Sequence, residues 1–316
     1  MLTRRDYLKY SAVAGTSYAI PGAFLQALES GNAIKRAIPK SGEELPIVGL
    51  GSSATFRTVA QSADVSALRA VMETLVKKGG SVFDTAPSYG ASEEVAGNIV
   101  QELGIQESIF WATKVNVAPW GGGSADPDAA MAQIEQSFRF VRKDPIDLIQ
   151  VHNLGDIATQ LPIVRKLKDE GRVRYIGITS TSARRYSDLA QYMRKESLDF
   201  IGVDYAVDNR TSAKTILPLA EELGIAVLAY APFGRTRLWE RVKDQPIPEW
   251  ALEFGADSWA KFFLKYVVSH PAITCVTPAT SKLKNMLDNI GAAYGELPDE
   301  KTQLRMSEYV DALPSA

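Results

Sequence analysis

Short apolar runs of strand length alternate along this chain with longer stretches in which apolar residues recur every three or four positions. The short runs predict β-strands, and the longer stretches predict amphipathic α-helices that bury one face. The runs that fit a strand are residues 48–51, 82–84, 109–111, 148–151, 175–178, 200–203, 226–230 and 273–276.

Regular alternation of strand and helix predicts a parallel sheet. Eight such units at near-equal spacing predict a closed (β/α)8 barrel, the TIM barrel of the α/β class. An open dinucleotide-binding sheet is disfavoured, because no G-x-G-x-x-G motif follows the first strand. We therefore expect residues 34–316 to form a single barrel domain.

Segments outside the repeated units add three expectations. A Ser41-Gly42 turn within residues 38–47 predicts a hairpin before the barrel. Asp126-Pro127 predicts the start of one helix, and residues 298–313 predict a terminal helix against the barrel. The loops at 117–128 and 233–253 are long, so they either cover the active site or pack through their own aromatic residues.

Composition excludes several classes of protein. The chain has 316 residues, 46% of them hydrophobic and 23% charged, with a formal net charge of −2, so we expect a globular protein that binds no nucleic acid. A single cysteine, Cys275, excludes an internal disulfide. With only two histidines in the chain, His152 lacks a second imidazole with which to build a zinc site, and we expect no metal.

The first 33 residues read as a Tat-type signal peptide. Arg4-Arg5 is followed by a moderately apolar stretch and then by small residues near Gly31, which is the order of a twin-arginine export signal. This predicts the Tat export machinery as a partner and a periplasmic location. A stable membrane anchor is disfavoured, because Gly15 and Pro21 interrupt the apolar run. The alternative is a chance arginine pair at a cytoplasmic amino terminus.

Four polar side chains follow three of the predicted strands: Asp84 and Tyr89, Lys114, and His152. Carboxyl ends of parallel barrel strands meet at one face, where catalytic groups collect. There Lys114 would lower the pKa of the Tyr89 phenol, ordinarily about 10, and Asp84 would hold Lys114 in place. His152 could hydrogen-bond either the substrate carbonyl or the phenol, and so orient the substrate.

Such a group can protonate a carbonyl oxygen while hydride reaches the carbon, or run in reverse on an alcohol. Because no side chain supplies hydride, a nicotinamide cofactor must do so. Taken singly, Asp84 could be a helix cap, Lys114 a surface charge and His152 a core residue.

At these motifs the chain resembles the aldo-keto reductase superfamily, from about residue 38 to the carboxyl end. The resemblance rests on Asp84-Thr85-Ala86-x-x-Tyr89-Gly90, on Ala112-Thr113-Lys114, and on residues 148–153 ending in His152-Asn153. It implies that Asp84, Tyr89, Lys114 and His152 form a catalytic tetrad with Tyr89 as general acid. The implied substrate is a small-molecule aldehyde or ketone.

Further segments match the superfamily's cofactor-binding motifs, which implies NADPH as cofactor, with NADH possible. In the resemblance, the motif ending in Ser180 binds the nicotinamide carboxamide, and the aromatic residue of the seventh strand stacks on the nicotinamide ring. The segment from Thr277 to Asn289 grips the adenosine half. The implied cofactor residues are Ser52, Asp84, Thr179, Ser180, Tyr230, Phe233, Thr280, Ser281, Lys282, Asp288 and Asn289.

Three positions depart from the superfamily pattern. Gly202 stands where a glutamine usually contacts the carboxamide, so that contact is missing or is supplied by Asp204. Asn285 replaces an arginine that often binds the cofactor phosphate, which leaves this task to Thr280, Ser281, Lys282 and Lys284. Ala279 replaces a glycine or lysine.

Two rival functions follow from other readings of the same barrel. A non-catalytic nucleotide-binding barrel, acting as a sensor or assembly module, would fit the departures at Gly202 and Asn285. A barrel hydrolase or lyase would require paired carboxylates or metal ligands at the strand ends, and the sequence offers no convincing set.

Overall fold

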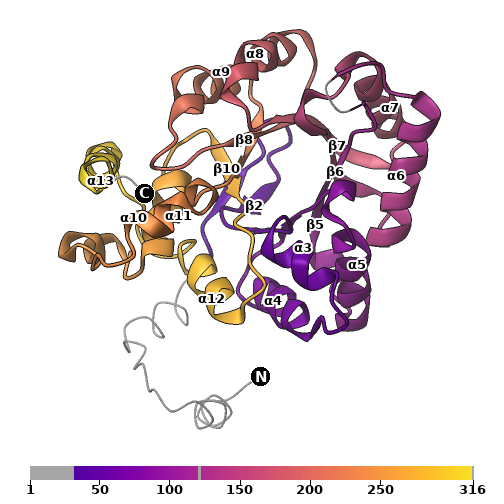
Figure 1. Ribbon diagram of the computed structural model, residues 1–316. Helices are drawn as coiled ribbons and strands as arrows, with labels where there is room; N and C mark the ends of the chain where they lie inside the picture. Colours follow the sequence, from indigo (N-terminus) through magenta and orange to yellow (C-terminus); the bar gives the residue numbers. More distant parts are fainter. Residues whose placement is uncertain (1–31, 120–121, 315–316) are drawn as a thin grey trace. The chain divides into compact units, whose positions relative to one another are not determined.

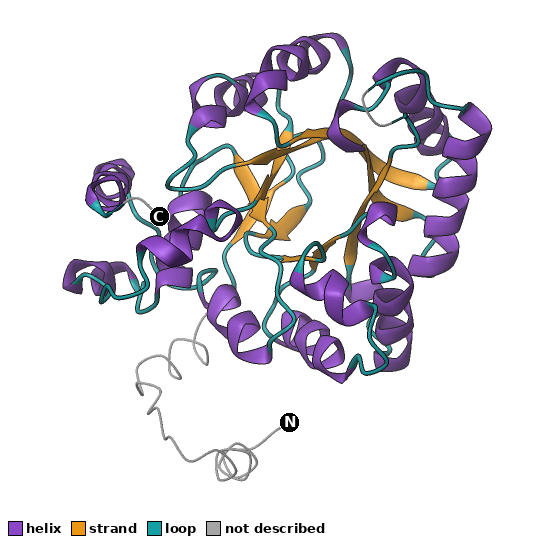
Figure 2. Ribbon diagram, in the orientation of Figure 1, coloured by secondary structure: helices purple, strands orange, loops and turns teal. Residues whose placement is uncertain are grey.

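The computed structural model describes residues 32–119 and 122–314, and it confirms the predicted (β/α)8 barrel. Eight parallel strands follow one another in chain order, and bridges from Val48 to Val276 and from Gly51 to Ala279 join the last strand to the first (Figure 2). The strands are β3 (Leu50–Gly51), β4 (Val82–Asp84), β5 (Phe110–Val115), β6 (Ile146–Val151), β7 (Val173–Ser180), β8 (Phe200–Asp204), β9 (Ala226–Tyr230) and β10 (Ile273–Val276).

Helices surround the barrel on its outer side (Figure 1). Asp126 begins one of them as predicted, because its carboxylate accepts a hydrogen bond from the amide of Asp128 at 2.9 Å. The helices are α3 (Thr55–Ala60), α4 (Ser66–Lys77), α5 (Ser92–Leu103), α6 (Pro127–Val141), α7 (Ile157–Asp169), α8 (Tyr186–Lys195), α9 (Ile216–Glu222), α10 (Arg237–Arg241), α11 (Trp259–Val268), α12 (Leu283–Gly291) and α13 (Glu300–Ala312).

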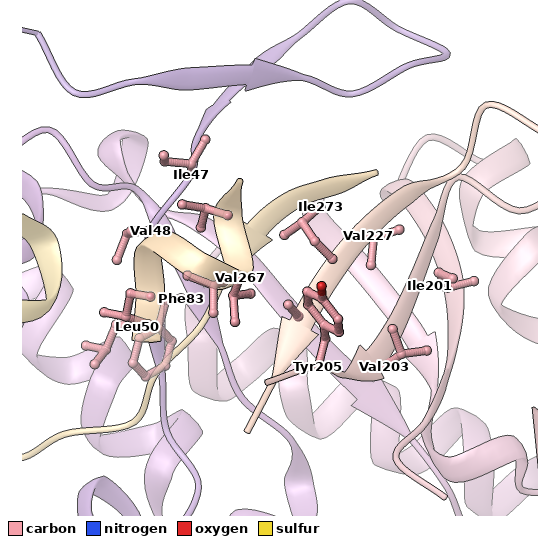
Figure 3. Packing of buried hydrophobic residues seen from close by; sticks show 14 of the residues in the cluster. Ile47, Val48, Leu50, Phe83, Ile201, Val203, Tyr205, Val227, Val267 and Ile273 are labelled. Atoms are coloured by element: carbon pink, nitrogen blue, oxygen red, sulfur yellow. The ribbon is translucent and has the colours of Figure 1, made fainter. Parts of the chain in front are cut away.

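Strand residues alternate between two apolar clusters, as the period of two requires. Side chains facing the helices form the larger cluster, and Figure 3 shows Ile201 and Val203 of β8 beside Val227 of β9. Side chains facing the barrel axis form a smaller cluster that includes Phe110 and Leu148. Along β4, β5 and β6 this inward face ends in polar residues, which sets the position of the site.

The predicted hairpin closes the end of the barrel opposite the site. Its strands are β1 (Lys35–Ala37) and β2 (Glu44–Pro46), and its Ile38 and Leu45 complete the inward apolar cluster. The hydroxyl of Tyr175 donates to Glu43 at 2.6 Å, and Arg174 pairs with the same carboxylate at 2.5 Å. Side chains therefore fill the barrel beneath the catalytic groups.

The long loop after β9 is packed by aromatic side chains. It contains α10 and the 3-10 segments η6 (Gly234–Thr236) and η7 (Glu249–Phe254). Trp239 packs against Phe233 with ring centroids 4.8 Å apart, and Trp250 packs against Phe262 at 5.8 Å. Aromatic residues of this loop therefore pack against one another and against α11.

The predicted signal peptide, residues 1–33, lies outside the described residues except at positions 32 and 33. Within the described ranges, no helix is both long and apolar enough to cross a membrane.

Candidate active site

Asp84 and Lys114 form a buried ion pair at the carboxyl ends of adjacent strands. Each continues the inward face of its strand, after Val82 on β4 and after Ala112 on β5. Nζ of Lys114 donates to both carboxylate oxygens of Asp84, at 2.8 and 2.9 Å, and to the carbonyl of Thr85 at 2.7 Å. All three donors of the ammonium group are thereby directed at oxygen atoms.

Tyr89 and His152 complete the predicted group of four. Tyr89 ends the short 3-10 segment η1 (Pro87–Tyr89), and His152 begins η3 (His152–Leu154) directly after β6. Nζ of Lys114 lies 5.4 Å from the centroid of the Tyr89 ring, and the His152 ring meets that ring edge-on at 6.0 Å and 83°. The structure therefore brings the four sequence-predicted residues together.

Burial dominates the acidity of Tyr89. Loss of hydration raises the pKa of the phenol, and the positive charge of Lys114 opposes this rise without cancelling it. The expected net lowering by Lys114 is therefore wrong for this structure, because partial burial outweighs the neighbouring charge. The phenol is protonated at neutral pH, which is the state that a proton donor needs.

Lys114 stays charged and His152 stays neutral. Burial alone would lower the pKa of Lys114, but Asp84 and Tyr89 together raise it above its ordinary value. Burial, together with the charge of Lys114, lowers the pKa of His152 to about 3. A neutral imidazole can still donate or accept one hydrogen bond at the mouth of the barrel.

Tyr230, expected at the nicotinamide ring, contacts the catalytic group directly. Its hydroxyl donates to Oδ2 of Asp84 at 3.0 Å and accepts from Nε2 of Gln150 at 3.1 Å. Its ring centroid lies 5.2 Å from Nζ of Lys114, so the ammonium group has a tyrosine ring on two sides. The ring also lies directly against the backbone of Gly202.

The hydroxyl groups of Ser52 and Thr277 lie at the same end of the barrel. Both are buried, and neither has a hydrogen-bond partner within the described part of the chain. Since unpartnered buried hydroxyls are uncommon, they fit a site that a polar ligand completes. Thr179 differs, because its hydroxyl already accepts from the amide of Asn153 at 2.9 Å. The hydroxyl of Ser180 lies 3.4 Å from the amide of Ser182.

Of the residues expected to bind adenosine, Thr280, Ser281 and Lys282 directly precede α12, and Asp288 and Asn289 lie in its second half. Lys282 precedes this helix and is exposed, and its amide donates to the hydroxyl of Thr280 at 3.1 Å. Ser281 is half-buried beside them. Asp288 accepts from Ser258 at 2.8 Å.

Further along α12, Asn289 is buried and Asn285 is exposed. Phe233, also expected to bind the cofactor, packs against Trp239 in the loop after β9.

Asp204, the expected substitute for the missing glutamine at position 202, is engaged within the fold. Its Oδ1 accepts from the hydroxyl of Tyr186 at 2.5 Å, and its Oδ2 accepts from Asn209 at 2.7 Å. The carboxylate thus holds α8 and the turn after β8, and this satisfies both of its oxygen atoms.

Sequence reasoning missed Gln150 and Arg235 as parts of the site. Alternation along β6 places Gln150 two positions before His152 on the same face, so period-two counting could have found it. Arg235 lies in a left-handed conformation (φ 53°), and its charge acts to lower the pKa of Tyr89. No strand pattern marks such a loop residue.

Comparisons with known proteins agree with this geometry. Residues 47–305 match the Aldo/keto reductase family. The aldo-keto reductase str7 of Strobilurus tenacellus is 27% identical over 266 residues, covering 73% of this chain and 77% of that protein. The uncharacterized oxidoreductase YqkF of Bacillus subtilis is 28% identical over 292 residues, covering 82% and 90%.

Solved structures share the fold. The holo form of the aldo-keto reductase AKR11C1 from Bacillus halodurans superimposes with a TM-score of 0.71 at 22% identity, covering 90% of this chain and 98% of that one. An aldo-keto reductase from Klebsiella pneumoniae in complex with NADPH also gives 0.71, at 21% identity, covering 88% and 95%. Because the family match spans most of the barrel, the chain belongs to the aldo/keto reductase family.

Proposed function

We propose that this protein is an NAD(P)H-dependent oxidoreductase that reduces aldehyde or ketone carbonyls, or oxidises the corresponding alcohols. The observation that carries the proposal is the buried Asp84–Lys114 pair beneath a protonated Tyr89, with the neutral His152 at its edge. Family membership points to the same chemistry.

Each residue of this group has a distinct role. Tyr89 donates the proton to the carbonyl oxygen of the substrate. Lys114, held charged by Asp84, stabilises the phenolate that remains. His152, neutral at physiological pH, hydrogen-bonds the carbonyl oxygen and orients it. When bound, a reduced nicotinamide cofactor supplies the hydride.

We propose NADPH as the preferred cofactor. Solved relatives from Klebsiella pneumoniae are in complex with NADPH or NADP. In this chain the buried hydroxyls of Ser52 and Thr277 offer donors at the barrel mouth. The amino end of α12, with Lys282 before it and Lys284 in its first turn, suits a phosphate group through both backbone amides and charge.

Replacing Tyr89 with phenylalanine tests the proposal, because the change removes the proton donor and keeps the ring. We expect NADPH consumption with a panel of aldehydes to fall by roughly 100-fold or more, while NADPH binding is retained. Wild-type protein that binds nucleotide but consumes none with any carbonyl would favour the sensor function. Equal rates for wild type and Tyr89→Phe would refute the role of Tyr89.

We also propose that the enzyme is exported to the periplasm by the twin-arginine route, with its cofactor already bound. The support is the Arg4-Arg5 pair and the apolar stretch after it. Cell fractionation of the wild type and of an Arg4→Lys, Arg5→Lys variant tests this. The wild type should appear in the periplasm with nucleotide detectable by mass spectrometry, and the variant should remain in the cytoplasm. The same location for both proteins would contradict the proposal.

A further inference from the structure

The hydroxyl of Tyr230 is held on both sides by buried polar groups. Gln150 on β6 donates to it at 3.1 Å, and it lies 3.0 Å from Oδ2 of Asp84 on β4. Because the amide occupies a lone pair of the hydroxyl oxygen, the hydroxyl proton points at the carboxylate. The Tyr230 side chain therefore reaches from β9 across the barrel, and its hydroxyl links Gln150 of β6 to Asp84 of β4.

Gly202 on β8 is the position that leaves room for this side chain. A Cβ atom there would lie 2.4 Å from Cε2, 2.6 Å from Oη and 2.7 Å from Cζ of Tyr230. The φ of Gly202 lies outside the left-handed region, so the approach of the ring, and not the backbone conformation, requires glycine. Since a packed ring cannot yield by so much in place, a side chain at this position would move the hydroxyl away from Asp84.

We propose that Tyr230 is a positioning residue, whose hydroxyl fixes the Asp84–Lys114 pair beneath Tyr89. The absence of a side chain at Gly202 leaves the space that the Tyr230 ring occupies. This inference rests on the proposed function, since it acts through that pair. It also accounts for the departure at position 202: the ring of Tyr230 occupies the space that a side chain there would take.

The hydroxyl has a definite chemical effect on Asp84. The carboxylate accepts two hydrogen bonds from Lys114, and Tyr230 supplies a third donor at Oδ2. A third donor stabilises the ionised form and fixes the plane of the carboxylate. The groups that face Asp84 are Lys114 of β5, Tyr89 of η1, Tyr230 of β9 and the buried Cys275 of β10.

The Tyr230→Phe variant removes this donor and keeps the ring. We expect kcat for carbonyl reduction to fall roughly tenfold, with KM for the carbonyl within about twofold of wild type, because the contact positions a catalytic group rather than the substrate. The acid limb of the kcat profile should move to higher pH, because loss of the donor makes Asp84 easier to protonate.

A matched control is Tyr175→Phe, which removes a tyrosine hydroxyl that donates to Glu43 at the other end of the barrel. It should lower the denaturation midpoint and leave both kcat and the acid limb unchanged. Adding a methyl group at position 202, with and without the Tyr230 ring, tests Gly202 separately. Gly202→Ala should lower kcat at least as much as Tyr230→Phe, yet cause no additional loss in a Tyr230→Ala background, where the ring is absent.

A measurement without cofactor or substrate completes the test. Denaturation midpoints of Tyr230→Phe, Asp84→Asn and the double variant should be non-additive, because the two groups interact directly. If the wild type reduces no carbonyl, the proposed function fails. The denaturation midpoints of the Tyr230 and Asp84 variants, and of the Gly202→Ala and Tyr230→Ala variants, still test whether Tyr230 positions Asp84. Additive midpoints, or a Tyr230→Phe variant with wild-type kcat and an unchanged acid limb, would overturn the inference.

Discussion

At the scale of single residues, charge and burial act in opposite directions on the catalytic group. Burial raises the pKa of Tyr89 and lowers that of His152, while the ion pair with Asp84 keeps Lys114 charged. The resulting site holds one ion pair, one neutral acid and one neutral imidazole over a wide range of pH. This combination suits delivery of a proton to a neutral carbonyl.

The pH dependence of reduction follows from these directions. His152, with a pKa of about 3, stays neutral above that value, and Tyr89 stays protonated until the pH exceeds the ordinary range of a phenol. We expect kcat for reduction to show no inflection near pH 6.5, the ordinary value for histidine. Steady-state rates between pH 5 and 9 check this, with His152→Gln as control. An inflection near 6.5 that disappears in His152→Gln would contradict it.

Sequence alone located the catalytic group but gave no indication of the contacts of the Tyr230 hydroxyl. Asp84, Lys114 and His152 could be predicted because each follows an apolar strand, and parallel strands end at one face. The path of the Tyr230 ring depends on a missing side chain at Gly202, on a different strand. No local pattern encodes such a contact.

At the scale of elements, strands and long helices could be predicted, and short helices could not. All eight strand runs are strands in the structure, because their apolar residues face a core on both sides. Helices α3 and α10 have only six and five residues. These are too short for an amphipathic repeat to stand out, and their stability comes from tertiary packing.

One helix contact gives a stability prediction. A Cβ at Gly97 of α5 would lie 1.9 Å from the carbonyl oxygen of Phe140 in α6, so Gly97→Ala should force the helices apart. Overpacking costs about 3 kcal/mol, against about 1 kcal/mol gained in helix propensity, so the free energy of unfolding should fall by about 2 kcal/mol. Chemical denaturation measures it, with the exposed Glu94→Ala on the same helix as control. Unchanged stability of Gly97→Ala would show that the contact can relax.

At the scale of the whole molecule, the nucleotide and the fold stabilise each other. A ligand that binds only the folded barrel raises the free energy of unfolding by about 2.7 kcal/mol at 100 times its Kd. We therefore expect NADPH to raise the melting temperature by several degrees, and NADH to raise it less at equal concentration. Differential scanning fluorimetry, with adenosine as control, checks this. A melting temperature that no nicotinamide nucleotide moves would argue against a nucleotide site.

The hairpin at the amino ends of the strands has a consequence for turnover. Because Ile38 and Leu45 complete the packed interior, with Tyr175 bonded to Glu43 at its margin, the barrel offers no passage through that end. Cofactor and substrate must therefore both enter at the carboxyl ends of the strands. We therefore expect the reactant that binds deeper to bind first and to leave last, which is an ordered kinetic cycle.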